Sequence, residues 1–157
     1  MGSQMKKEFY FNWDHSYFEQ LFQKKDSLHR LGAGRHFSAY LCRRAGFHYV
    51  LCVSHPSFFE AQRAKPQSWI NCMKALKELD HPWIPPFELM ECSNCFAYVR
   101  PYCETLRMDS GRGDAVCNKQ FEKVLAEAGL VLDDYWHFGF WKNEHQIMID
   151  WSDLRRR

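Results

Sequence analysis

The sequence lacks the features that mark exported, membrane-spanning and nucleic-acid-binding chains. No apolar run approaches the roughly 18 to 20 residues needed to cross a bilayer, and residues 1–7 lack the apolar core of a signal peptide. The net charge of +2 provides no concentrated basic surface for a phosphate backbone. There is no internal repeat and no low-complexity tract. We therefore expect a cytoplasmic chain that neither inserts into a membrane nor binds nucleic acid.

The sequence also lacks the regular cysteine spacing of a disulfide framework, although it has seven cysteines. An odd number scattered through apolar runs indicates free thiols in a reducing compartment. Cys92 and Cys95 have the spacing of one half of a zinc site, but no second pair follows, and only Cys103 and Cys117 could complete it. We interpret the pair as two free cysteines on a hairpin, with a structural zinc site as the alternative.

Composition favours one folded domain. A chain of 157 residues with 46% hydrophobic and 17% aromatic residues can bury roughly 60 to 70% of its surface. Asp14 is a helix N-cap for the run that follows, in which aromatic and leucine side chains recur at helical spacing until about Asp26. We expect a helical extension over residues 1–27, a lobe of sheet and helix over 28–103, and a helix with a terminal hairpin over 118–157.

Turn signals and apolar spacing predict the remaining elements. Hairpins are expected around Ala45-Gly46, Ser93-Asn94 and residues 142–144. Helices are expected over 66–80, with Ser68 as a cap, and from the capping residue Asn118 to Gly129. Residues 81–86 contain three prolines and fit neither a helix nor a central strand, and 104–116 lacks periodicity and predicts a loop. The fold class is α+β: an antiparallel sheet of about five strands, with a helix after the third.

Three groups of residues could carry chemistry. Gly32 and Gly34, followed by Arg35, form a turn whose backbone N–H groups could approach a phosphate, and a plain hairpin turn would use the same residues. Asp150 closes an apolar strand and could present its carboxylate to Mg²⁺, or could cap the following turn. Asp133 and Asp134 lie between them in the chain.

In this order the motifs resemble the N-terminal half of the protein kinase-like fold. LGAGRHFSAYLC resembles its glycine-rich loop, and IMIDWSDL resembles its metal-binding aspartate motif. The sequence is similar to small bacterial kinase-like proteins, including the PhoP-regulated kinase-like family and the lipopolysaccharide core sugar kinases. The resemblance implies ATP and Mg²⁺ as ligands, Gly32, Gly34 and Arg35 at the nucleotide, Asp150 at the metal, and Asp134 with Asp133 at the catalytic position.

The sequence departs from this pattern at two places. FHYVLCVSH contains no lysine where the third strand of a kinase carries one, and the matching position is Cys52 or a neighbour. Five residues after Asp133 and Asp134 stand Phe138 and Gly139 rather than the asparagine that holds a second metal ion. We interpret the chain as a noncatalytic, pseudokinase-type domain that regulates or binds a protein partner. The alternative is a divergent phosphotransferase on a small molecule or sugar, with Lys65, Arg35 or Arg100 replacing the lysine.

Overall fold

The chain forms two compact units. The computed structural model describes residues 2–33, 36–55, 66–91, 95–109, 115–132 and 136–157. Unit 1 consists of Met1–Arg63 and Pro86–Tyr102, and unit 2 consists of Ala64–Pro85 and Cys103–Arg157. That the whole chain is a single domain stays a prediction.

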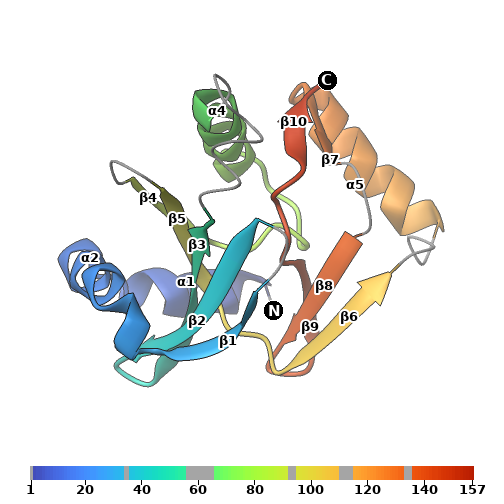
Figure 1. Cartoon of the computed structure of the whole chain (residues 1–157). Helices are drawn as coiled ribbons and strands as arrows, with labels where there is room; N and C mark the ends of the chain where they lie inside the picture. Colours follow the sequence, from blue (N-terminus) through green and yellow to red (C-terminus); the bar gives the residue numbers. More distant parts are fainter. Residues whose placement is uncertain (1, 34–35, 56–65, 92–94, 110–114, 133–135) are drawn as a thin grey trace. The chain divides into compact units, whose positions relative to one another are not determined.

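Unit 1 is built on a five-stranded antiparallel sheet in the order β1-β2-β3-β5-β4 (Figure 1). This confirms the predicted α+β class, with about five strands and a helix after the third strand in the chain. The first predicted hairpin joins β2 to β3 through Ala45 and Gly46, whose φ of 50° and 86° lie in the left-handed region that matches strand twist. The second pairs β4 with β5, and its predicted turn residues, Ser93 and Asn94, lie outside the described residues. The strands are β1 (His29–Ala33), β2 (Phe37–Arg44), β3 (Phe47–Ser54), β4 (Glu88–Glu91) and β5 (Phe96–Pro101).

Helices α1 (Gly2–Phe11) and α2 (His15–Gln23) lie against one face of this sheet. The rings of Phe9 and Phe18 contact Tyr49 of β3 at centroid distances of 5.1 and 4.7 Å, and Trp13 stacks on both of them. The Tyr49 hydroxyl donates to the Phe9 carbonyl at 2.7 Å. Asp14 caps α2 as predicted, accepting from the Tyr17 N–H, and a short 3-10 turn (Lys25–Ser27) follows.

Unit 2 combines two small sheets with two helices. One sheet has the order β6-β8-β9 and the other pairs β10 with β7, and helix α4 packs on β10 and α5 on β7 (Figure 1). The elements are α4 (Pro66–Lys77), β6 (Thr105–Asp109), α5 (Ala115–Glu127), β7 (Leu130–Leu132), β8 (Trp136–Trp141), β9 (His145–Met148) and β10 (Leu154–Arg156).

Three local predictions in unit 2 are wrong. Residues 105–109 form a strand instead of a loop, because they pair with β8 from Thr105 opposite Phe140 to Asp109 opposite Trp136. Helix α4 begins at Pro66, a residue suited to the first turn, so Ser68 lies inside it. Helix α5 begins at Ala115, before the predicted cap Asn118. Its end is as predicted, since Gly129 follows it with φ of 74°.

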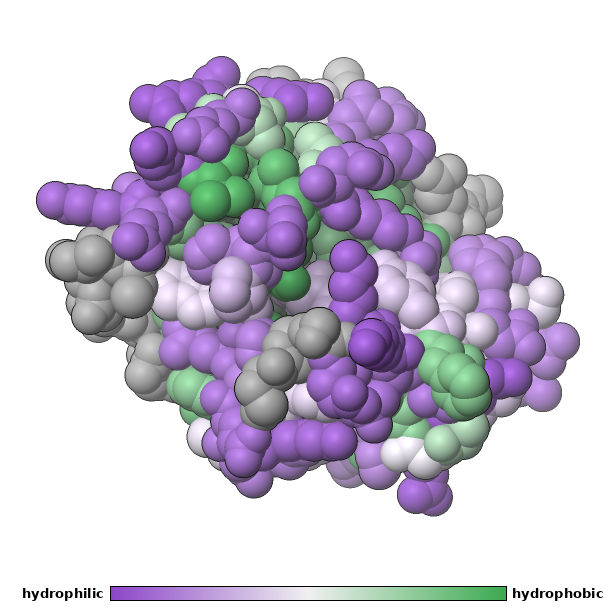
Figure 2. Space-filling view, turned by 180° about the vertical axis from the view of Figure 1, so that it is seen from behind, coloured by the Kyte–Doolittle hydropathy of each residue, from purple (hydrophilic) through white to green (hydrophobic). Residues whose placement is uncertain are grey.

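Aromatic side chains form the core of unit 2. Trp83, Phe121, Trp136 and Phe138 contact one another at ring-centroid distances between 5.1 and 6.5 Å, and the Trp151 ring lies 6.3 Å from that of Phe121. Large hydrophobic side chains that are exposed among the described residues are Phe11, Leu31 and Leu106. On the face drawn in Figure 2, hydrophilic residues predominate and hydrophobic ones show only in small areas.

Candidate nucleotide-binding and metal-binding residues

Gly32 lies in unit 1, in strand β1 rather than in a turn. It pairs with Ala39 of β2 just after an irregularity in register that follows Arg30. A Cβ atom at this position would meet nothing within 4 Å, and the backbone is not in the left-handed region. Gly32 is therefore exposed backbone that a phosphate could approach, but its own strand does not require glycine. Gly34 and Arg35 lie outside the described residues.

Strand β3 carries no cation. Its side chains alternate between the sheet faces, so Tyr49 faces the helices α1 and α2 while Val50, Cys52 and Ser54 face the opposite side. Cys52 is buried, and Ser54 accepts a hydrogen bond from the Phe96 N–H at 2.8 Å. The face on which a kinase would present its phosphate-binding lysine has on this strand the exposed imidazole of His48, an aliphatic side chain, a thiol and a hydroxyl, and neither lysine nor arginine.

The cations that could replace the lysine are placed differently. Arg100 of β5 lies directly opposite Val50, on the same face as Cys52, and is buried. One of its guanidinium nitrogens donates to the Pro101 carbonyl at 2.9 Å. Lys74 lies exposed on α4 in unit 2, and Lys65 lies outside the described residues.

The connection that would form the catalytic loop is short. Strand β7 ends at Leu132 and β8 begins at Trp136, so residues 133–135 alone connect them. Asp133 and Asp134 belong to this connection and lie outside the described residues. Phe138 and Gly139, at the positions expected for the metal-binding asparagine, are buried within β8, which pairs with β6 on one side and β9 on the other.

Asp150 follows β9 in unit 2 and is half-buried. Its Oδ1 accepts hydrogen bonds from the Ser152 N–H at 3.0 Å and from the Ser152 hydroxyl at 2.8 Å. The next carbonyl, that of Trp151, accepts from the Trp69 indole at 3.0 Å and from the Leu154 N–H at 3.1 Å. The carboxylate thus caps the following turn, which is the alternative role expected from the sequence. Metal binding by Asp150 stays a prediction.

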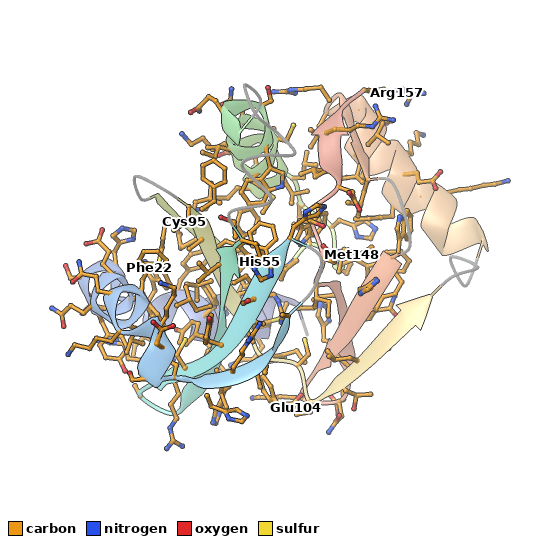
Figure 3. The ribbon with its side chains drawn as sticks, viewed as in Figure 1. Phe22, His55, Cys95, Glu104, Met148 and Arg157 are labelled. Carbon is orange, nitrogen blue, oxygen red and sulfur yellow. The ribbon has the colours of Figure 1, made fainter. Side chains whose placement is uncertain are left out.

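The cysteines do not all behave as predicted. Cys42, Cys52, Cys72 and Cys103 are buried and are not disulfide-bonded. Cys95, labelled in Figure 3 and directly before β5 in the chain, is disulfide-bonded. The prediction of free thiols is therefore wrong for Cys95, and a disulfide sulfur cannot be the thiolate ligand of a zinc ion. The described residues contain no group of three or more metal-ligating side chains.

Comparisons with known proteins identify the fold. No protein-family model matches the chain, and no curated protein matches it in sequence. The crystal structure of the Mycobacterium tuberculosis PknI kinase domain matches with a TM-score of 0.56 and 17% sequence identity, over 80% of this chain and 58% of that domain. The chain has a kinase-like fold. It spans little more than half of the kinase domain that it matches.

Within the part of the chain that the structure describes, no helix is long and apolar enough to span a bilayer.

Proposed function

We propose that this chain is a noncatalytic, pseudokinase-type protein that acts by binding a protein partner. At the family level, its LGAGR and IMID motifs favour the small bacterial kinase-like proteins, of the PhoP-regulated or lipopolysaccharide core sugar kinase type. The kinase-like fold supports the general class. The expected absence of turnover follows from the chemistry of the site residues.

The observation that carries the proposal is the short connection between β7 and β8. A kinase catalytic loop presents an aspartate that receives the hydroxyl proton and, about five residues later, an asparagine that holds a metal ion. Here residues 133–135 are the whole connection, and the fifth residue after Asp133 or Asp134 is already in the interior of β8. The positions expected for the asparagine therefore lie inside a strand and not on a loop.

The composition of β3 supports the same conclusion. A lysine there would neutralise charge on the transferring phosphoryl group, and such an electrostatic contact typically contributes roughly 10² to 10³ in rate. No residue from Phe47 to Ser54 is a lysine or arginine. Losing both this contact and the asparagine would lower the rate by roughly 10⁴ to 10⁶ if the two effects are independent.

Phosphate release from ATP in the presence of Mg²⁺ tests the proposal directly. We expect no release above that of the buffer from the purified chain. The informative variant is Asp150→Asn, because the amide oxygen can still accept from Ser152 while the charge is lost. Asp26→Ala, at an exposed position in unit 1, is the matched control. The proposal is contradicted if the chain turns over ATP and Asp150→Asn or Asp134→Asn abolishes this turnover while Asp26→Ala does not. That result would favour the phosphotransferase.

Nucleotide binding is measured separately, by thermal unfolding with and without ATP and Mg²⁺. A ligand that binds only the folded chain stabilises it by about 2.7 kcal/mol at 100 times its Kd. If ATP shifts the melting temperature but is not turned over, the chain is a nucleotide-binding pseudokinase. If ATP causes no shift and is not turned over, the chain is a kinase-like protein that binds only its partner. Both outcomes agree with the proposal, because ATP binding is not part of it.

A further inference from the structure

Residues 80–85, which follow α4 in unit 2, are held in place by an imidazole. The Nδ1 atom of His81 lies 3.0 Å from the backbone nitrogen of Trp83 and accepts its N–H. The His81 ring also lies against Phe121 of α5, at a centroid distance of 4.9 Å, and against the Trp83 ring at 5.4 Å. Pro82 and Pro85 have no N–H to donate, so the Trp83 amide is one of few donors in this connector.

The same connector is bonded to strand β9. The Met148 N–H donates to the Trp83 carbonyl at 2.8 Å, and His145 Nε2 lies 2.8 Å from the Pro82 carbonyl. Met148, labelled in Figure 3, is the last residue of β9. Trp83 therefore stands between the His81 imidazole on its amide side and the end of β9 on its carbonyl side.

The hydrogen bond from Trp83 specifies one protonation state of His81. Nδ1 can accept only when it carries no proton, so the neutral imidazole has its proton on Nε2. Burial lowers the pKa of His81 below its ordinary value, and the nearby Asp80 carboxylate partly opposes this shift. On α5 the described charged residues, Lys119, Glu122, Lys123 and Glu127, are exposed, and the other titratable group bonded to the connector is His145.

We propose that His81 is an acid-sensitive latch: protonation of Nδ1 breaks the bond from the Trp83 N–H and frees residues 80–85 from β9 and α5. A protonated imidazole has two donors and no acceptor, so the Trp83 N–H loses its partner. This inference is independent of the proposed function. It concerns a conformational response of unit 2 to pH.

The direction of the pH dependence follows from linkage. The closed connector binds fewer protons than the open one, so closure is fully favoured above the ordinary pKa of histidine, about 6.5, and weakens as the pH falls below it. At pH 5.5 the protonated form of an open-state imidazole with that pKa outnumbers the neutral form by about tenfold. Opening should therefore become up to about tenfold more frequent between pH 7.5 and 5.5.

Amide hydrogen exchange at Met148, followed by NMR, measures this opening. The protection factor, which corrects for the intrinsic pH dependence of exchange, should fall up to about tenfold between pH 7.5 and 5.5. In His81→Asn the amide oxygen can replace Nδ1 as an acceptor and does not titrate, so the fall should disappear. In His81→Phe the ring is kept without an acceptor, so protection should be low at both pH values.

His48→Asn, at an exposed position of β3 in unit 1, is the control and should retain the wild-type response. The proposal is overturned if His81→Asn shows the same fall in protection as the wild-type chain, or if the wild-type chain shows none. Should the variants fail to fold, the ring resonances of His81 in the wild-type chain decide the question, since a titration at or above the ordinary pKa overturns the latch.

Discussion

Replacing Gly139 by alanine should strongly destabilise unit 2. A Cβ atom added at this position in β8 would lie 2.6 Å from Cys103 Sγ, 2.7 Å from Cys103 Cβ and 3.0 Å from Ile149 Cγ2. The Cys103 Cβ is fixed to its backbone, so no change of side-chain rotamer removes that contact. Overpacking of this kind costs roughly 1 to 3 kcal/mol, and we expect about 2 to 3 kcal/mol here. For a chain of this size the melting temperature should fall by roughly 4 to 12 °C.

Denaturant unfolding followed by circular dichroism measures the change in unfolding free energy. Gly32→Ala is the matched control, because its Cβ would meet nothing within 4 Å, and its stability should be unchanged or slightly raised. Cys103→Gly removes both cysteine atoms, so Gly139→Ala should cost at least about 1 kcal/mol less in that background. The packing argument is refuted if Gly139→Ala unfolds within about 0.5 kcal/mol of the parent chain.

Two further predictions concern unit 1. Asp14→Ala removes the acceptor for the Tyr17 N–H and should cost about 1 kcal/mol of unfolding free energy, whereas Asp14→Asn should retain most of it; equal losses would exclude the capping role. Burial raises the pKa of the Cys42 thiol to about 12, with a smaller contribution from Cys52, so only about 10⁻⁴ of it is thiolate at pH 8. Mass spectrometry should find Cys42 unmodified by iodoacetamide in the folded chain under conditions that label it fully in urea, and equal rates would contradict its burial.

The parts of the fold that sequence predicted are those fixed by neighbouring residues. The Asp14 cap, the Ala45-Gly46 hairpin and the Gly129 helix end each depend on backbone chemistry within a few residues. Their residue types leave few local conformations. Helix α1 lies within the helical extension expected over residues 1–27, but its own bounds were not predicted, although the buried residues Met5 and Phe9 are four residues apart, at helical spacing.

The parts that failed depend on residues far away in the chain. Strand β6 exists because it pairs with β8. Its one described large apolar side chain, Leu106, is exposed, so the sequence showed no alternation of apolar and polar residues that would indicate a buried face. Within the candidate site, sequence identified the missing lysine and asparagine. It could not show that Asp150 caps Ser152 or that the bonding of the connector at His81 reaches β9, because both depend on three-dimensional placement.

The short link between β7 and β8 limits what protein engineering could achieve with this scaffold. Phe138→Asn would restore the residue type that a kinase has, but position 138 is buried with its ring 5.1 Å from that of Trp83. The new amide would be desolvated inside a sheet instead of facing a metal ion, at a cost of roughly 1 to 3 kcal/mol. Catalytic gain would thus require inserting residues to lengthen the link, and a point substitution at position 138 alone would only destabilise the fold.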